Sequence, residues 1–597
     1  MLVEQHLSQS IKSAITSLYG VNIDDKQIQV QKTKREFEGD FTLVVFPLLK
    51  ISKKKPEDTA NEIGEYLQST LPAIDSFNII KGFLNICLSQ SFWCNFLNTI
   101  AQTVDYGFAE PDSSGETKMV EFSSPNTNKP LHLGHIRNNL LGFSVARLLE
   151  ANGHRAVKVN LVNDRGIHIC KSMVAWKKFG EGETPETRGI KGDHLVGNYY
   201  VLFEKEYRKQ VEKLKAQGLS EEDAKVKAPL IVEAQEMLRK WEAKEPDVYS
   251  LWKNMNQWVY NGFDVTYKEM GVEFDKIYYE SQTYLLGREI VNDGLEKGIF
   301  YRKNDGSVWI DLTADGLDEK LLLRADGTSV YMTQDIGTAS QRFSEFQLDD
   351  HIYIVGNEQE YHFKVLKLIL SKLGYSWANH LYHLSYGMVQ LPEGKMKSRE
   401  GKVVDADDLM VEMVATAREM SKEFGKLNDA NEEEATSIVK MVGMGALKYF
   451  ILKVDPKKNM TFNPKESIDF NGNTGPFIQY SHARIQSVLR KANASGIQVP
   501  HVLSSSIDLG DKERELIKQL SIFPSYIQQA GEQLSPALIA NYVYDLAKEY
   551  NQFYHDYSIL KEPNEGIRDL RLIISRETGN VIRLAMWLLG IEVPNRM

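Results

Sequence analysis

The chain has 597 residues and a formal net charge of −10, with 42% hydrophobic and 25% charged residues. This length exceeds a single hydrophobic core, so we expect several domains with the composition of an ordinary soluble protein. The negative charge argues against a protein that coats nucleic acid non-specifically, because phosphate binding depends on clustered lysine and arginine.

The N-terminus and the cysteines indicate a cytoplasmic protein. MLVEQHLSQSIKSAI lacks the basic and apolar segments of a secretory signal. No stretch shows the roughly 20 apolar residues that span a bilayer, so no membrane association is expected. Cys87, Cys94 and Cys170 form no CxxC pair and predict neither a disulfide framework nor a zinc site.

The first hundred or so residues combine helical and strand patterns. Residues 56–70 begin with proline and acids, as helices do. Residues 77–89 alternate like strands around a turn at Lys81 and Gly82. The polar segment 110–117 then indicates a linker after an α+β domain.

The next segment has the pattern of a βαβ unit. A short apolar strand at 118–122 is followed by the loop SSPNTNKP, a helical run from Leu131 to Glu150 and a second apolar strand at 155–162. This order predicts a parallel sheet.

Residues from about 165 to 260 are highly charged and helical, which predicts an insertion on the sheet; a coiled coil is disfavoured because apolar heptads are not sustained. Two hairpins that turn on Asp-Gly are expected at 301–312 and 321–332. A buried strand at 351–356 and a helix at 361–374 follow. Beyond about residue 403 the pattern is helical to the end, most clearly in 431–453 and 471–492.

The strongest motif is SSPNTNKPLHLGH at 123–135. His132 and His135 lie three residues apart and share one face if they occupy the first turn of a helix, whose N-terminus suits phosphates. Gly134 removes a side chain where a nucleotide must approach the backbone. The motif follows a parallel strand, at the edge where open α/β sheets bind ligands. The alternatives are two solvated histidines or a metal site, and the latter lacks a nearby cysteine or an acid at ligand spacing.

A second motif, GKMKSREGKVV, lies at 394–404. It suits a mobile basic loop that closes on a triphosphate and stabilises the charge that develops on pyrophosphate. Taken alone, it is equally an ordinary solvated basic turn.

The first motif resembles the HIGH signature of class I aminoacyl-tRNA synthetases, and its full length is similar to the arginyl branch. The second resembles the KMSKS loop of the same class. Further similarity to the arginyl family extends over nearly the whole chain and is weakest between about 176 and 260. It lies in VNDRGIHI (162–169), YYESQTY (278–284), YMTQDIG (331–337), VGNEQEYHF (355–363), GPFIQYSHARI (475–485) and the terminal PNRM.

This resemblance implies an α/β protein with a doubly wound, Rossmann-type catalytic core, a helical insertion and an all-α anticodon-binding domain. The implied parts are an N-terminal domain that binds the corner of tRNA, a catalytic domain with its insertion near 176–260, a connecting helical domain and an anticodon-binding domain. Their expected ranges are 1–112, 113–402, 403–470 and 471–597.

The resemblance also implies an arginine site. The substrate guanidinium is planar, permanently charged and rich in donors, which calls for fixed carboxylates. Glu280 and Asp335 would hold it, Tyr331 would pack on the side chain, and Asn126 and Gln359 would contact the α-amino and carboxylate end. Each acid could instead be an ordinary solvated residue.

For ATP, the resemblance implies binding by a set of residues from the two motifs: His132, Gly134, His135, Lys395 and Met396. Catalysis would depend on His132, His135 and Lys395. The second motif departs from the consensus, because Ser398 stands where its second lysine is expected and Lys397 is displaced by one. We hypothesise that Lys129 supplies the missing charge.

For tRNA, the resemblance implies contacts of Phe83 and Asn85 with the corner of the molecule. Phe477 and Tyr480, three residues apart on one helical face, could pack against splayed anticodon bases, and Met597 aligns with a family contact. Ordinary core packing is the alternative for each of them.

The implied activity is that of an arginine–tRNA ligase. Arginine would be activated by ATP to arginyl-adenylate and then transferred to the terminal adenosine of tRNA, with Mg²⁺ arriving on ATP and no structural metal. We expect a monomer. A cysteine enzyme of the same class is disfavoured, because scattered cysteines supply no thiolate-bound zinc. A catalytically weak, synthetase-like tRNA-binding protein is the other alternative, which the presence of His132, His135 and Lys395 disfavours.

Overall fold

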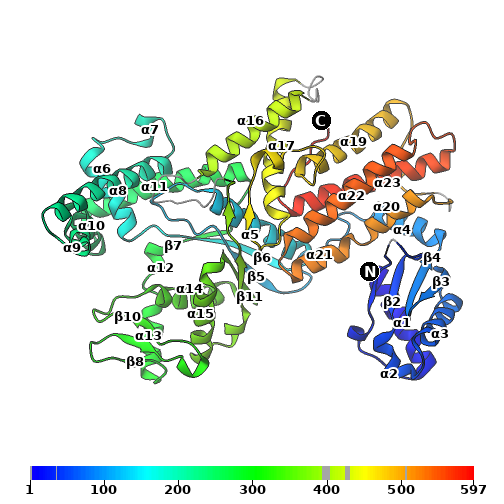
Figure 1. Cartoon of the computed structure of the whole chain (residues 1–597), viewed down its shortest axis with the longest axis horizontal. Coiled ribbons are helices and arrows are strands. Elements are labelled where there is room, and N and C mark those ends of the chain that lie inside the picture. The colour runs from blue at the N-terminus through cyan, green and yellow to red at the C-terminus, as the bar shows by residue number, and fades with distance from the viewer. Residues whose placement is uncertain (1–2, 35, 393–403, 424–430, 504–506) are drawn as a thin grey trace.

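The computed structural model describes residues 3–34, 36–392, 404–423, 431–503 and 507–597. A parallel sheet lies at the centre of the molecule (Figure 1). The inserted helices extend from it on one side, and the C-terminal helices lie on the other with the N-terminal domain beside them (Figure 1).

The central sheet has the strand order β12-β11-β5-β6-β7, and every pairing in it is parallel. The chain moves from β5 outward to β7 and later continues on the other side of β5 through β11 and β12, so the sheet is doubly wound as expected. Ligands of such sheets bind where the two directions diverge, beyond the carboxyl ends of the strands. The strand bounds are β5 Thr117–Glu121, β6 Arg155–Val162, β7 Lys276–Tyr279, β11 Asp350–Gly356 and β12 Leu381–Tyr386.

Helix α5 (Leu133–Ala151) connects β5 to β6 and confirms the predicted βαβ unit, although it begins two residues later than expected. It lies close to the sheet because Gly142 has no side chain, and a Cβ there would be 2.3 Å from Cγ of Phe122. Arg137 on the same helix is buried and donates to the carbonyls of Met388, Pro456 and Lys458.

The predicted helical insertion is confirmed as a set of helices between β6 and β7. Its members are α6 Ile167–Phe179, α7 Pro185–Arg188, α8 Gly192–Ala216, α9 Glu221–Lys227, α10 Pro229–Glu242 and α11 Pro246–Met270. The outer helices carry surface ion pairs such as Lys225 with Glu221, while α6, α8 and α11 bury apolar faces.

The first predicted hairpin is confirmed as β8 (Tyr301–Arg302) and β9 (Val308–Ile310). The second is only partly right. β10 (Lys320–Leu323) pairs back onto β9, and after the turn a single bridge joins Leu323 to Ser329. Tyr331 then begins α14 (Tyr331–Phe346) instead of continuing a strand.

The remaining elements of this part are α12 Glu280–Thr283, α13 Gly287–Glu296, α15 Glu360–Lys372 and β13 Val389–Gln390. The predicted strand at 351–356 and the helix at 361–374 correspond to β11 and α15 and are confirmed.

The described residues after 403 are mainly helical, as predicted, and β14 (Met460–Thr461) among them pairs with β13. Its helices are α16 Ala406–Glu423, α17 Glu432–Leu452, α18 Pro464–Ser467, α19 Gly475–Ala494, α20 Asp511–Ser521, α21 Phe523–Glu532, α22 Pro536–Asp556 and α23 Glu565–Leu588. Among the described helices, α17 alone is long and apolar enough to cross a membrane, contrary to the expectation that no stretch is, but 72% of its apolar window is buried inside the protein.

The N-terminal domain has an antiparallel sheet of order β1-β2-β4-β3, with α1 (Val3–Tyr19), α3 (Pro56–Thr70) and α4 (Gln90–Gln102) as its main helices. The predicted turn at Lys81 and Gly82 is confirmed, and both residues have positive φ. The strand bounds are β1 Val30–Lys32, β2 Phe41–Val44, β3 Ile74–Ile80 and β4 Phe83–Leu88.

Candidate active site

The two motif histidines lie at the start of α5, as predicted, but His132 caps the helix rather than lying in its first turn. Nδ1 of His132 accepts from the backbone N–H of Gly134 at 3.1 Å, and Nδ1 of His135 accepts from that of His132 at 3.2 Å. Their ring centroids are 4.0 Å apart. Gly134 makes room for this cap, since a Cβ there would be 2.9 Å from Cε1 of His132.

Both imidazoles are neutral at neutral pH. Burial, with a contribution from Lys129, lowers the pKa of His132 to about 4. Burial also places the pKa of His135 well below its ordinary value. Because each Nδ1 is an acceptor, each proton resides on Nε2. The pair therefore offers two neutral N–H donors beside a helix N-terminus, which suits phosphate oxygens.

A cavity of about 480 Å³ opens beside His132. Lys129 lines it, together with side chains of α8 and of the start of α16, including His194 and Asp405. Burial lowers the pKa of Lys129. A cation and a neutral histidine on the wall of one cavity make it the candidate phosphate site.

A second cavity of about 570 Å³ adjoins the first, and Asn126, Asn128 and His168 line both. Glu280 and Tyr331 line only the second cavity. Asn126 forms a β-bridge with Asn163 where β5 and β6 end, and Glu280 directly follows β7. The predicted arginine-site residues Asn126, Glu280 and Tyr331 are therefore brought together at the carboxyl edge of the sheet.

Arg165 occupies the wall of the second cavity beside Glu280. Its guanidinium carbon lies 4.0 Å from the ring centroid of Tyr284, and Nη1 is 3.9 Å from Oε1 of Glu280. A second ion pair joins it to Glu242 at 3.3 Å. Glu280 is only 7% exposed, and this burial raises its pKa to about 7 despite the nearby Arg165.

Asp335 and Gln359 are placed differently from these residues, although Asp335 lies close enough to Glu280 for its charge to contribute to the raised pKa of Glu280. Asp335 on α14 is paired with Nε2 of His362 at 2.6 Å, and Gln359 is exposed just after β11. Neither lines the two cavities. Lys395, Met396, Lys397 and Ser398 lie outside the described residues, so the predicted roles of the second motif stay predictions.

The two N-terminal residues predicted to contact tRNA lie on one face of β4. Phe83 is half-buried, and its ring packs edge-to-face with that of Phe46, with the ring centroids 5.5 Å apart. Asn85 is 1% exposed; its side-chain oxygen accepts from Thr42 at 2.7 Å, and its nitrogen donates to Asn78 at 2.8 Å. The hydrogen bonds of Asn85 therefore serve the sheet in this structure, whereas Phe83 retains exposed surface.

In the C-terminal helices, Tyr480 and Met597 line a hollow of about 890 Å³. Its walls also carry several cationic and aromatic side chains: Arg484, Arg490, Lys491, Lys561, Arg596, Tyr554 and Tyr557. Arg484 lies 4.8 Å from the ring centroid of Tyr480. Phe477 does not line the hollow and instead packs against Tyr544 at 5.4 Å. Positive charge with exposed aromatic rings suits single-stranded nucleic acid.

Several contributors to the site carried no individual signal in the sequence. Arg165 and Asp164 belong to the quoted segment VNDRGIHI, but only the fold shows that Asp164 accepts from the backbone and hydroxyl of Ser281 and so holds the residue after Glu280. His194 lies in the insertion, where the resemblance is weakest, and no motif indicates it.

The sequence matches three family descriptions in succession. Residues 5–88 match "Arginyl tRNA synthetase N terminal domain", 98–463 match "tRNA synthetases class I (R), catalytic domain", and 478–597 match "DALR anticodon binding domain". Arginine–tRNA ligases of Bacteroides fragilis and Porphyromonas gingivalis are 62% and 57% identical, each with the whole of both chains covered. The chain belongs to the class I arginyl-tRNA synthetase family.

Solved structures agree with this membership at the level of the fold. The arginyl-tRNA synthetase of Thermus thermophilus matches with a TM-score of 0.80 at 24% identity, over the whole of both chains. That of Plasmodium falciparum matches with a TM-score of 0.76 at 19% identity, over all of this chain and 99% of the other. The family's doubly wound core and helical C-terminal domain are those described above.

Proposed function

We propose that this chain is an arginine–tRNA ligase, which forms arginyl-adenylate from arginine and ATP and then transfers the arginyl group to the terminal adenosine of tRNA. Family membership over the full length supports the proposal. The observation that carries it is the pair of adjoining cavities, one beside Glu280 and the other beside Lys129 and His132. An amino acid whose guanidinium lies near Glu280 can extend its carboxylate past Asn126, which lines both cavities, toward a phosphate in the cavity beside Lys129 and His132.

The chemistry consists of positioning and charge stabilisation. An oxygen of the arginine carboxylate attacks the α-phosphorus of ATP, and the bond to pyrophosphate breaks. The Nε2–H groups of His132 and His135 donate to phosphate oxygens, and Lys129 offsets charge on the leaving group. Mg²⁺ that arrives with ATP would neutralise phosphate charge and would be held largely by phosphate oxygens and water, because this ion keeps several of its waters.

For tRNA we propose two contact regions. The hollow around Tyr480 and Met597 would receive splayed anticodon bases, with its cations on the phosphates. Phe83 would present the exposed part of its ring to the corner of tRNA. The further proposals are that the protein is cytoplasmic and monomeric.

The direct test is arginine-dependent exchange of pyrophosphate into ATP in the presence of tRNA, followed by charging of tRNA with labelled arginine. Both should be observed with arginine and be poor with lysine, because an ammonium cannot pair with carboxylates placed for a planar guanidinium. Absence of both reactions in folded protein would favour a synthetase-like tRNA-binding protein.

Alanine at Glu280 or Asp335 tests the arginine site. Loss of one partner of a desolvated charge pair costs about 3–5 kcal/mol, which corresponds to roughly a hundred- to several-thousandfold in affinity. A near-normal arginine KM and kcat in either variant would remove that residue from the site.

A further inference from the structure

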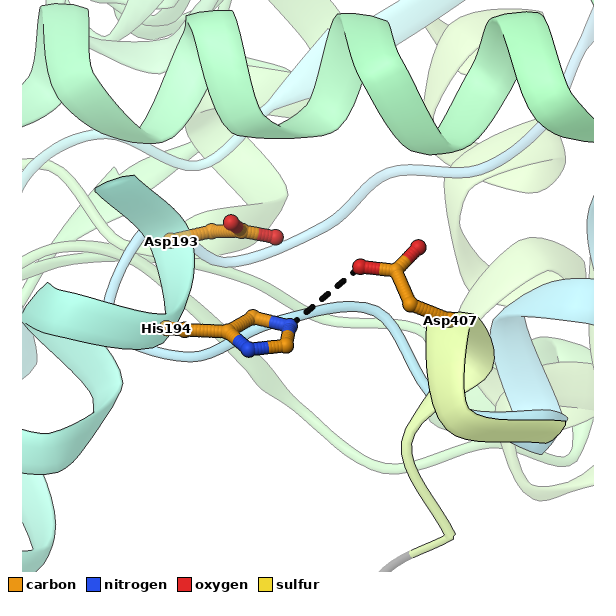
Figure 2. Close-up of side chains that lie close together, drawn as sticks. All are labelled: Asp193, His194 and Asp407. Atoms are coloured by element: carbon orange, nitrogen blue, oxygen red, sulfur yellow. Dashed lines mark ion pairs between the residues drawn. The ribbon is translucent and has the colours of Figure 1, made fainter. Parts of the chain in front are cut away.

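A cluster of charged side chains joins the insertion to the wall of the phosphate cavity. Asp193 and His194 begin α8, and Asp407 lies in the first turn of α16, with its carboxylate facing His194 (Figure 2). Nε2 of His194 is 3.3 Å from a carboxylate oxygen of Asp405 and 3.3 Å from one of Asp407. These two contacts raise the pKa of His194 to about 10, so it carries a proton at neutral pH.

Lys191, the residue that caps α8, completes the cluster. Its ammonium contacts the carboxylate of Asp407, donates to the hydroxyl of Thr266 at 2.6 Å and lies 3.4 Å from Asp193. Burial opposes the charge of Asp407, yet His194 and Lys191 hold its pKa at about 2. The side chain of Asp193 is fully buried against Gly262, where a Cβ would be 2.3 Å from its Oδ1.

Residues 404–407, which include Asp405 and Asp407, are hydrogen-bonded through their backbone to the segment that contains His132. The backbone N–H of Leu133 donates to the carbonyl of Val404 at 3.1 Å, and that of Ala406 donates to the carbonyl of Leu131 at 3.0 Å. His132 and Asp405 thereby form a β-bridge. Residues 404–407 therefore lie between His132 on one side and His194 on the other, and Asp405 and His194 both line the cavity.

The ligand atoms of Asp193, His194 and Asp407 lie within 4.8 Å of one another, as in a metal site. Two observations disfavour a metal ion. The ammonium of Lys191 already lies between the two carboxylates, and His194 needs its proton to face two acids. The cations of the chain itself supply the charge that a metal would bring.

We propose that Lys191 and His194 are positioning residues for ATP. By neutralising Asp405 and Asp407 they fix residues 404–407 against the backbone of His132, and they keep two carboxylates from repelling the triphosphate. The inference rests on the proposed function for its catalytic consequence, but it also predicts a weaker affinity for ATP itself.

The test compares His194→Gln, Asp407→Asn and the double variant with the wild type. His194→Gln keeps a donor and removes the charge. Its kcat/KM for ATP in pyrophosphate exchange should fall roughly two- to 150-fold, the range that corresponds to the interaction energies of coupled neighbours. The arginine KM should change less than about twofold, since Glu280 lies in the other cavity. The double variant should lose less activity than the product of the two single losses.

Lys171→Gln is the matched control, because Lys171 also forms an ion pair with a carboxylate at the insertion, at 2.7 Å from Glu204 of α8, but lines neither cavity. It should leave the ATP parameters unchanged, and His194→Lys, which restores the charge, should recover part of the loss. Binding of ATP to the RNA-free protein, measured by calorimetry, gives a readout that does not need turnover, so an inactive wild type would defeat the proposed function without deciding this inference.

Any one of the following results would overturn the inference. The first is an ATP affinity and kcat/KM within twofold of wild type in His194→Gln. The second is an equal loss in Lys171→Gln, or an arginine KM that moves as far as the ATP KM. The third is stoichiometric binding of Mn²⁺ by the wild type without ATP that His194→Gln abolishes, which would identify the cluster as a metal site.

Discussion

Glu280, which we propose to bind arginine, lowers the stability of the folded protein when its carboxyl is charged. Its carboxyl is buried beside Arg165, and its pKa is raised to about 7. A carboxyl whose folded pKa exceeds its unfolded value favours the folded state fully only below the unfolded pKa. This contribution is lost as pH rises from about 4.5 to 7, by up to about 3 kcal/mol. The negative charge that burial of Glu280 disfavours is the charge with which a substrate guanidinium would pair.

Glu280→Gln should therefore separate the two effects. We expect a higher Tm than wild type at pH 8 and a smaller gain at pH 5.5, because the wild-type carboxyl is mostly neutral there. The kcat/KM for arginine should rise from pH 6 to 8 in the wild type and be low and flat in the variant. Thermal unfolding and exchange kinetics across pH check this, and a variant that is no more stable at pH 8 would contradict it.

Lys129 is the second residue whose surroundings suggest a task. Lys129 and His132 line the same cavity. Burial disfavours the charged form of Lys129, and a bound anionic phosphate would stabilise that charge. We expect Lys129→Ala to lower kcat by about a hundred- to a thousandfold with a modest change in arginine KM, as for loss of one electrostatic stabiliser. Ser398→Lys should recover part of the loss in that background and do little in the wild type.

The competing explanation assigns this charge to Lys397, which predicts the reverse pattern. If Lys397→Ala has a strongly reduced kcat while Lys129→Ala keeps a near-normal kcat, Lys397 is the catalytic cation. Lys178→Ala is a suitable control, because Lys178 forms an ordinary surface pair with Glu233 in the insertion.

At the scale of elements, α19 places Phe477 and Tyr480 on different surfaces, although their spacing of three residues predicted one common face. Phe477 faces Tyr544 of α22, whereas Tyr480 faces the basic hollow. Tyr480→Ala should raise the KM for tRNA, since base–aromatic stacking is worth about 1–3 kcal/mol per base. Phe477→Ala should mainly lower the stability of the domain. For a half-buried ring we expect the free energy of unfolding to fall by up to about 3 kcal/mol, which lowers the Tm.

Charging kinetics and melting curves of both variants test this division. An unchanged KM for tRNA in a folded Tyr480→Ala variant would show that the ring of Tyr480 only packs within the protein. A raised KM for tRNA in Phe477→Ala without loss of stability would instead indicate that Phe477 and Tyr480 both contact the RNA.

At the scale of the whole molecule, distant parts of the chain are joined by specific polar contacts. Asp40 of the N-terminal domain, with a side chain only 1% exposed, pairs with Arg514 at 2.7 Å and with Lys518, both on α20. The C-terminal helices in turn contact α5, where Ser144 donates to the carbonyl of Leu588 at 2.7 Å and Asn152 to that of Ile527 at 3.0 Å. The helix that carries His132 at its start therefore touches the domain that would hold the anticodon.

We expect arginine activation to require tRNA. Asp335 is paired with His362, Gln359 is exposed, and neither lines the cavities in this structure, so we expect a rearrangement to complete the arginine site. RNA bound to the C-terminal helices can promote that rearrangement through their contacts with α5. Pyrophosphate exchange should be roughly five- to 150-fold slower without tRNA, the usual range of coupling between sites. Rapid exchange by the RNA-free protein would refute this, and a non-cognate tRNA is the control.

The sequence by itself determined the βαβ core, the insertion and the helical C-terminal part. Through the family resemblance it also indicated Asn126, Glu280 and Tyr331, which line one cavity at the carboxyl edge of the sheet. Local periodicity and an ordered set of motifs suffice for these, since strand order constrains which loops meet. It predicted a full second hairpin, yet Tyr331 begins α14, because the start of that helix is decided by packing rather than by the Asp-Gly turn.

Only the tertiary structure decided which side chains share a cavity. It placed Tyr480 and Phe477 on different surfaces, paired Asp335 with His362, made His132 a helix cap and brought His194 of the insertion to Asp405 and Asp407. Asp335 and His362 lie 27 positions apart in the sequence, and Asp405 and Asp407 lie more than 200 positions after His194. Charge and burial at such contacts depend on how the elements pack, and no local pattern in the sequence carries that information.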